Sequence, residues 1–378
     1  MTESRDLGWI RSWATSPQMT DAVFADVTLR QEIRISGGGR RVRIRLTNEY
    51  GTAPLTVGAG RLGLATAGGG IAPGSDRVLT FGGRAGVVIP AGAPVLSDPV
   101  DLPVSALARL SVSLYLPNRV EACTGHDMPL DTGWVIPGDA VAEAALPGDA
   151  EPLPAWALVS AVEVLPDEPA GVVVVLGDSR VDGVGSTAGG GWPERLAERG
   201  VYVCGQGISG NRLLNDGLGP SGLARFDRDV LATPGLSHVV VSIGLNDIAV
   251  SFAPRVGPLA DFLTMFPGEP VTAQDVIAGF RQLIDRGHDR GVRVYATTMA
   301  PYGGNDIFSP EGEAVRRTVN DWIRTSDAFD AVLDFDAVWR DPTRLDRIRG
   351  DLHEGDHLHG NDAGYQALAD SIDPSIFK

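Results

Sequence analysis

The stretch Val172-Val-Val-Val-Leu-Gly-Asp-Ser179 decides how the second half of this chain folds. An unbroken apolar run is typical of a strand that is covered on both faces, as strands of a parallel sheet are. The run ends in Gly177-Asp178-Ser179, and open parallel sheets bind their ligands at the carboxyl ends of the strands. Ser179 is therefore a candidate nucleophile, although the same three residues also suit an ordinary strand-to-helix turn.

Further apolar runs follow, with helical patterns between them. We expect strands at residues 201–203, 239–243, 292–297 and 332–335. Apolar residues at helical spacing predict a helix capped by Thr272 and another that begins at Ser309-Pro310. This alternation predicts right-handed βαβ units and a parallel sheet with helices on both faces.

The first part of the chain has a different pattern. Apolar residues alternate with polar ones in residues 41–46 and 110–116, as in strands with one buried face. Gly37-Gly-Gly39 lies between two such runs and predicts a hairpin turn. We expect residues 10–145 to form an antiparallel β-sandwich of the jelly-roll kind. Residues 145–170 are rich in proline and acidic residues, which favours a connection.

The length of the chain, 378 residues, predicts two domains. We assign residues 1–165 to the β-sandwich domain and its connection, and residues 166–378 to the α/β domain. The formal net charge of −16 opposes binding to a phosphate backbone, so nucleic acid is not an expected partner.

Several other features limit the possible classes of protein. No run approaches the ~18 apolar residues that a membrane span needs, and the first residues lack the pattern of a secretory signal. The expected location is therefore the cytoplasm. Cys123 and Cys204 are far apart in sequence, which predicts two free thiols. The sequence does not predict the oligomeric state.

Two later strand ends carry groups that can donate hydrogen bonds. Gly205-Gln-Gly-Ile-Ser-Gly210-Asn211 follows the second run, and the N–H of Gly210 can face an oxyanion. Gly244-Leu-Asn246-Asp247 follows the third run and supplies the side-chain amide of Asn246. Each sequence is also common in turns, so neither is specific alone.

A carboxylate and an imidazole lie three residues apart before the last expected helix, which Asn361 can cap. This spacing lets Asp356 reach the ring of His359 and fix its tautomer. A metal cluster of His353, Asp356, His357 and His359 is the alternative. A closed metal site needs further ligands, and no cysteine lies nearby. We therefore predict no metal and no other cofactor.

In combination, these four segments resemble the conserved blocks of the SGNH (GDSL-like) hydrolase family, over roughly residues 170–378. The whole chain is similar to a two-domain subgroup that carries an N-terminal β-domain. The resemblance implies a three-layer α/β/α fold and a serine esterase. It also implies that Ser179 is the nucleophile, His359 the base and Asp356 the residue that orients His359.

The resemblance further implies an oxyanion hole formed by the N–H groups of Ser179 and Gly210 and the amide of Asn246. The chain departs from the family after the serine, where Arg180 and Val181 replace an aliphatic residue and threonine. Arg180 is interpreted as covering the surface, with an altered acyl or leaving-group preference as the alternative.

Three further polar residues adjoin these blocks. Asp178 and Asp247 are expected to hold loops through hydrogen bonds to the backbone. Arg180, Asp182 and Asp247 are also candidates for contact with substrate.

The expected activity is hydrolysis of short acyl esters of the acetyl type, with carbohydrate as a candidate alcohol part. The alternatives are an acyltransferase, a lysophospholipase-like lipid esterase, or a non-catalytic carbohydrate-binding protein. Residues 251–270 form a long connection with three phenylalanines. Connections of this length often form lids, and we expect this one to line the acyl pocket.

Overall fold

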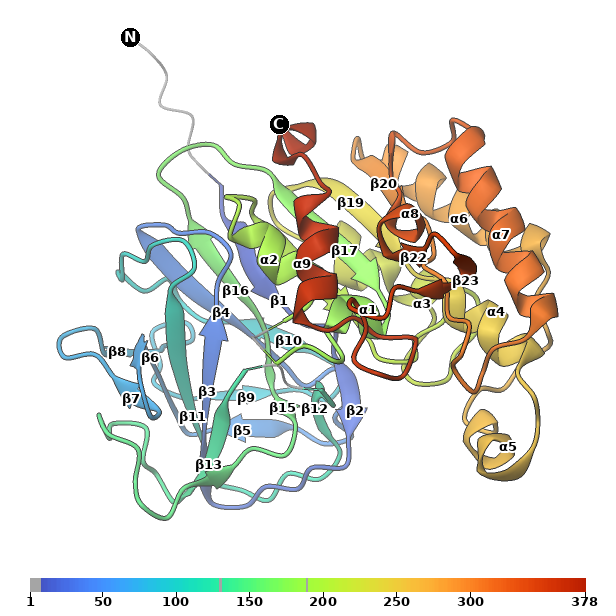
Figure 1. Cartoon of the computed structure of the whole chain (residues 1–378). Coiled ribbons are helices and arrows are strands. Elements are labelled where there is room, and N and C mark those ends of the chain that lie inside the picture. Colours follow the sequence, from blue (N-terminus) through green and yellow to red (C-terminus); the bar gives the residue numbers. More distant parts are fainter. Residues whose placement is uncertain (1–7, 129–130, 188–189) are drawn as a thin grey trace, which may run out of the picture. The chain divides into compact units, whose positions relative to one another are not determined.

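The chain divides into two units, Met1–Ala170 and Gly171–Lys378 (Figure 1). The structure is a computed structural model and describes residues 8–128, 131–187 and 190–378. In these ranges, no helix has both the length and the apolar character that crossing a bilayer requires. Cys123 and Cys204 are buried free thiols, as expected from the sequence.

The first unit consists of antiparallel sheets, and its described residues form no helix. One sheet has the strand order β1-β16-β4-β10 and a larger one the order β14-β13-β3-β11-β6-β7, with β8 paired to β6. The smaller sheets are β15-β12-β2 and β5-β9. The strands are β1 (Ile10–Ala14), β2 (Gln18–Thr20), β3 (Val27–Arg34), β4 (Arg41–Thr47), β5 (Leu55–Val57), β6 (Ala59–Thr66), β7 (Gly70–Ile71), β8 (Arg77–Val78), β9 (Val87–Ile89), β10 (Pro94–Leu96), β11 (Arg109–Leu116), β12 (Cys123–His126), β13 (Gly133–Pro137), β14 (Glu151–Pro152), β15 (Trp156–Ala157) and β16 (Val159–Leu165).

The predicted alternation is observed in β4, where Val42, Ile44 and Leu46 are fully buried and the arginines between them are not. In β11 the serines between the apolar residues are buried as well. This strand pairs with β3 on one side and β6 on the other, so it lies inside its sheet.

The prediction of a hairpin turn at Gly37-Gly-Gly39 is wrong. β3 belongs to the larger sheet and β4 to the four-stranded one, so the glycines connect two sheets. None of the three has a positive φ. A Cβ atom on Gly38 would lie 2.4 Å from the Val104 carbonyl oxygen, and one on Gly39 would lie 2.5 Å from that of Leu165. Glycine is needed here because other backbone segments pass very close.

The expected connection at residues 145–170 also differs from the structure. It contains β16, which pairs with both β1 and β4 in the four-stranded sheet. Proline-rich segments precede and follow this strand, and the sequence prediction of a connection rested on their composition.

Substitution of Gly38 by alanine tests the close approach. The added methyl group would clash with backbone atoms, which cannot rotate away, so Gly38→Ala should lower the free energy of unfolding by about 1–3 kcal/mol. Gly148→Ala is the matched control, because a Cβ atom there meets nothing within 4 Å. Calorimetry of both variants should show a lower melting temperature for the first and little change for the second. Equal melting temperatures would contradict this account.

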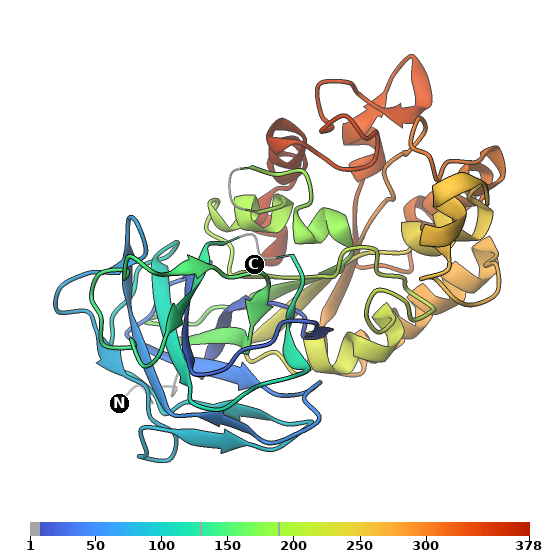
Figure 2. The ribbon, with the colours of Figure 1, turned by 90° about the horizontal axis from the view of Figure 1, so that it is seen from below.

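The second unit has a parallel sheet with helices on both faces, the three-layer α/β/α arrangement (Figures 1 and 2). Its strand order is β18-β17-β19-β20-β21. The strands are β17 (Val172–Gly177), β18 (Val203–Gly207), β19 (Leu236–Ser242), β20 (Arg293–Thr297) and β21 (Ala331–Leu333), and a separate pair is formed by β22 (Arg340–Asp341) and β23 (Arg344–Ile348). The helices are α1 (Ser179–Asp182), α2 (Trp192–Ala197), α3 (Gly222–Phe226), η1 (Asp227–Leu231), α4 (Leu245–Phe252), α5 (Gly257–Leu263), α6 (Ala273–His288), α7 (Pro310–Thr325), α8 (Phe335–Trp339), α9 (Asp362–Asp370) and η2 (Pro374–Phe377).

Local sequence explains most of these elements. Every residue of β17 is buried, as expected for a strand between two others. Thr272 caps α6 in a capping box with Asp275, Ser309 caps α7 and Asn361 caps α9, so all three predicted helix starts are confirmed. The expected strand at 201–203 begins only at its last residue.

The strand order has a topological switch point at β17. Its two neighbours, β18 and β19, are the next two strands in sequence and lie on opposite sides of it. Such a switch point is where open α/β sheets bind ligands, because the connections leave in opposite directions and a space opens between them.

Candidate active site

Ser179 is the first residue of α1 and follows β17 with one residue between them. The Asp178 side chain caps this helix and accepts a hydrogen bond from the Arg180 N–H at 3.1 Å. A Cβ atom on Gly177 would lie 2.1 Å from Val181 Cγ2, so only glycine allows α1 to turn back over the strand end. Ser179 itself is 9% exposed.

Three residues predicted from separate motifs are in hydrogen-bond contact. His359 Nε2 lies 2.9 Å from Ser179 Oγ, and His359 Nδ1 lies 2.6 Å from Asp356 Oδ2. An ionised carboxylate can only accept, so it fixes the proton on Nδ1 and leaves the lone pair of Nε2 for the serine hydroxyl. The geometry suits proton transfer from the hydroxyl to the ring.

Asp356 is kept ionised by its own loop. Burial alone would raise its pKa, but hydrogen bonds from the His359 ring and from the backbone N–H groups of His359 and Leu358 hold the pKa well below its usual value. The two N–H groups donate to Oδ1 at 2.9 and 2.8 Å. The acid and the imidazole are therefore arranged within one short loop.

The predicted oxyanion donors lie at the next two strand ends. Gly210 follows β18 with a φ of 74°, a conformation suited to glycine. Asn246 lies in the first turn of α4, and its Nδ2 donates to the Asn211 carbonyl at 2.9 Å. In the described part of the chain, no group accepts a hydrogen bond from the backbone N–H of Ser179 or Gly210. Both N–H groups can therefore serve a bound anion.

Two buried carboxylates hold the loop that carries Gly210. Asp182 accepts from the N–H and hydroxyl of Ser209, at 3.2 and 2.8 Å. Asp247 accepts from the N–H groups of Leu213 and Leu214, at 2.6 and 2.9 Å. The loop-holding role predicted for Asp247 is thus observed. Both carboxylates were also candidates for substrate contact, and the structure places them against the backbone of their own domain.

Arg180 likewise has partners within its domain. Its guanidinium donates to the carbonyl groups of Leu358, Ala300 and Pro301, at 3.1, 3.3 and 3.4 Å. Burial lowers the pKa of Arg180, and the nearby Asp178 carboxylate opposes that shift. The side chain therefore joins loops and does not simply cover the surface.

Arg225 is a residue of the site that the sequence analysis missed. Its side chain is fully buried and donates to the carbonyl groups of Gly177 and Gln206, at 2.8 and 2.9 Å, and to Asn211 Oδ1 at 3.1 Å. It thereby ties the ends of β17 and β18 to the loop that carries Gly210. No motif surrounds Arg225, and an isolated arginine in a short helix gives no signal in a sequence.

The residues of the alternative metal cluster have other arrangements. The rings of His353 and His357 lie 4.4 Å apart, centre to centre. Glu354, Asp356 and His359 present possible ligand atoms within 4.8 Å of one another. The ring nitrogen of His359 that faces Asp356 is Nδ1. An ion bound by these three residues would therefore replace the proton on Nδ1.

The buried Asp247 should make the free energy of unfolding depend on pH. Burial raises its pKa to about 6, against the effect of the two backbone hydrogen bonds, whereas an unfolded Asp titrates near ~3.9. The folded chain therefore holds this proton more tightly, and the stabilisation present below pH ~4 should be lost as the pH rises through about 6. Urea unfolding of the wild type and Asp247→Asn at several pH values should show the wild type losing stability relative to the variant over this range. A pH-independent difference would contradict the assignment.

A family model and several solved structures are similar to this chain. The GDSL-like lipase/acylhydrolase family model matches residues 175–367, slightly more than half of the chain. No curated protein matches. Similar solved structures include an aryl esterase of M. smegmatis, with 16% identity, a TM-score of 0.41, and coverage of 55% of this chain and 98% of that one.

A putative acylhydrolase of Bacteroides fragilis has 17% identity and a TM-score of 0.41, with coverage of 56% of this chain and 88% of that one. The acetyl xylan esterase AlAXEase has 21% identity and a TM-score of 0.39, with coverage of 53% of this chain and 96% of that one. The residues matched by the family model include the strand ends and loops of the candidate site. The chain belongs to the GDSL-like lipase/acylhydrolase family and is a carboxylic ester hydrolase.

Proposed function

We propose that Ser179, His359 and Asp356 form the catalytic triad of a serine esterase that works through an acyl-enzyme. The observation that carries this proposal is the continuous hydrogen-bond chain from Ser179 Oγ through the His359 ring to Asp356. Ser179 Oγ attacks the ester carbonyl while His359 takes its proton. His359 then returns the proton to the leaving alcohol, and water repeats the sequence to release the acid.

The oxyanion hole in this proposal consists of the N–H groups of Ser179 and Gly210 and the amide of Asn246. Its support is that neither N–H donates to a group in the described residues, and that one amide hydrogen of Asn246 already bonds Asn211. That contact fixes the direction of the amide and leaves its second hydrogen for an oxyanion. Donors held in this way need not reorganise when charge develops.

A small acyl group of the acetyl type is the proposed preference. Leu218 lies directly against Gly210, since a Cβ atom on that glycine would be 2.6 Å from Leu218 Cδ1. Leu218 also packs on the apolar cluster of Val250, Ala253, Leu263 and Phe266. This packing limits the space beside the proposed oxyanion donors and so favours short acyl chains.

A polar alcohol part, such as a carbohydrate, is also part of the proposal. His359 returns the proton to the leaving alcohol, so the alcohol must lie near this ring. One neighbour of the ring is a carboxylate, since Glu354 Oε1 lies 3.9 Å from Nδ1, and the same loop carries the rings of His353 and His357, which lie 4.4 Å from each other. Such groups can hydrogen-bond hydroxyl groups of a sugar.

A lipid ester is the second candidate, and one observation favours it. The segment around α5 exposes the large apolar side chains of Val256, Phe262 and Met265. It corresponds to the connection that we predicted to line the acyl pocket, and Leu263 and Phe266 pack it onto α4. The two candidates are distinguished by kcat/KM for acetyl, butyryl and octanoyl esters, measured in solution and in vesicles. The highest value for the acetyl ester supports the short acyl preference, and the highest value for the octanoyl ester in vesicles supports the lipid ester.

Loss of the Ser179 hydroxyl is the direct test of the triad. With an aryl acetate as substrate, Ser179→Ala should lower kcat by about 10⁴-fold or more, since the remaining groups only bind and polarise the ester. Ser186→Ala is the control, because this hydroxyl bonds Asp362 and not His359. A serine-directed phosphonate should label the control and not the Ser179 variant. Turnover by Ser179→Ala near the wild-type rate would disprove the assignment.

The acyl preference can be tested at Leu218. Leu218→Ala removes the side chain that limits the space near Gly210, so kcat/KM for the butyryl ester should rise at least about 10-fold relative to the acetyl ester. Leu345→Ala is the control, because this leucine is exposed and lies in β23. An unchanged ratio would show that Leu218 does not limit the acyl group.

A further inference from the structure

The loop that contains Asp356 and His359 is held from outside by two side chains. Arg180 Nε donates to the Leu358 carbonyl at 3.1 Å, and Asn305 Nδ2 donates to the Asp356 carbonyl at 2.8 Å. These carbonyl groups lie on the two sides of His357. His357 has a φ of 61°, in the left-handed region that side chains other than glycine rarely adopt. The two contacts therefore fix the one residue of the loop whose backbone is unfavourable.

Both holding side chains connect this loop to the segment after β20. Arg180 also donates to the carbonyl groups of Ala300 and Pro301, at 3.3 and 3.4 Å, and Asn305 follows a few residues later. The Arg180 guanidinium lies 5.6 Å from the centre of the buried Trp339 ring. A planar guanidinium can serve several carbonyl groups in one plane, which the ammonium of a lysine cannot do in the same way.

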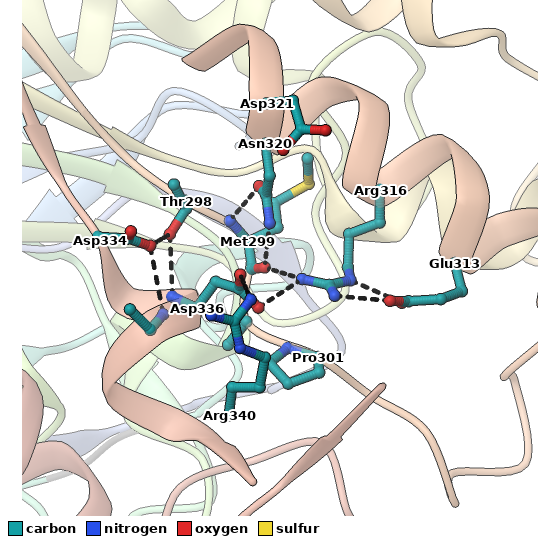
Figure 3. Close-up of polar contacts among 12 residues, drawn as sticks. Thr298, Met299, Pro301, Glu313, Arg316, Asn320, Asp321, Asp334, Asp336 and Arg340 are labelled. Atoms are coloured by element: carbon teal, nitrogen blue, oxygen red, sulfur yellow. Dashed lines mark hydrogen bonds and ion pairs between the residues drawn. The ribbon is translucent and has the colours of Figure 1, made fainter. Parts of the chain in front are cut away.

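The segment after β20 is itself anchored by a buried amide and by buried charged side chains (Figure 3). Asn320 accepts from the Met299 N–H and donates to the Met299 carbonyl, both at 2.8 Å. Arg316 also donates to this carbonyl and forms ion pairs with Glu313 at 2.7 Å and Asp336 at 2.9 Å. Met299 directly precedes Ala300, so Arg180 binds to a part of the backbone that cannot easily move.

We propose that Arg180 and Asn305 are positioning residues for the triad. By holding the carbonyl groups on both sides of His357, they maintain its left-handed conformation and keep His359 at hydrogen-bond distance from Ser179. Because Arg180 follows Ser179 on the same helix turn, it links the nucleophile directly to the loop of the base. This inference depends on the proposed triad, and it assigns to Arg180 a role other than contact with substrate.

The test compares kcat and KM for an aryl acetate in four variants of the full chain. Arg180→Ala and Asn305→Ala should each lower kcat about 10- to 100-fold, since small displacements of a catalytic group have effects of this size, while KM stays within about threefold. Arg180→Lys should recover only part of the loss. Arg199→Ala is the matched control, because Arg199 also donates to backbone carbonyl groups, those of Ala369 and Ile372, but at the end of α9.

A second measurement separates positioning from a general effect on folding. Guanidinium ion at low millimolar concentration should restore part of kcat in Arg180→Ala, by occupying the space of the lost side chain, and should not increase kcat in the wild type or in Arg199→Ala. Melting temperatures show whether each variant is folded. If Arg180→Ala does not fold, Asn305→Ala carries the test; it removes the donor to the Asp356 carbonyl and the local acceptor of the Ile307 N–H.

The outcomes distinguish this inference from the proposed function. A large rise in KM with kcat unchanged in Arg180→Ala would show contact with substrate and overturn the positioning role. Wild-type kcat in both Arg180→Ala and Asn305→Ala would also overturn it, while the loss of turnover in Ser179→Ala would leave the triad in place. Full turnover by Ser179→Ala would remove the triad and this inference together.

Discussion

The strand order β18-β17-β19 is the constraint on which the proposed site depends. It brings the ends of three successive strands to one edge, so that Ser179, Gly210 and Asn246 follow neighbouring strands although they are far apart in sequence. Hydrogen bonds between the strands set the positions of the strand ends, and side chains then hold the residues that follow them, as Asp182 and Asp247 hold the loop of Gly210. The imidazole is different, because His359 lies in a loop before α9 and no strand fixes it.

Polar side chains hold what the sheet does not. Buried carboxylates from α1 and α4 bind the loop of Gly210, and buried arginines bind the carbonyl ends of strands and loops. Breaking such contacts leaves a buried charge or polar group without a partner, which costs more than the contact itself contributes. This makes each of these residues sensitive to substitution, even though none of them is part of the proposed triad.

Much of the second unit could be predicted from the sequence, because its signals are local. Apolar runs indicated the strands, and Thr272, Ser309 and Asn361 indicated helix starts. Ser179, Asp356 and His359 were selected from motifs and are in contact, although their roles remain predictions. Arg225 and Asn305 could not be found, because the carbonyl groups of Gly177, Gln206 and Asp356 that they bind come near them only in the folded chain.

The first unit shows the same limit in another form. Alternation in β4 predicted which face is buried, but alternation is identical for a strand in either sheet. Gly37-Gly-Gly39 was therefore interpreted as a hairpin turn, whereas the chain crosses to a second sheet there. The glycines are needed because the backbone passes close to them at Val104 and Leu165. Neither residue is near them in sequence, so the sequence pattern does not reveal these contacts.

Asp356 and His359, the proposed acid and base, share one loop, and this has a consequence for motion. Asp356 binds both the His359 ring and the backbone N–H groups of its own turn. These three hydrogen bonds couple the carboxylate to the imidazole, so a displacement of the loop backbone would move both groups together. Such a displacement would change the separation of the imidazole from the Ser179 oxygen, while the contact between Asp356 and His359 would be kept.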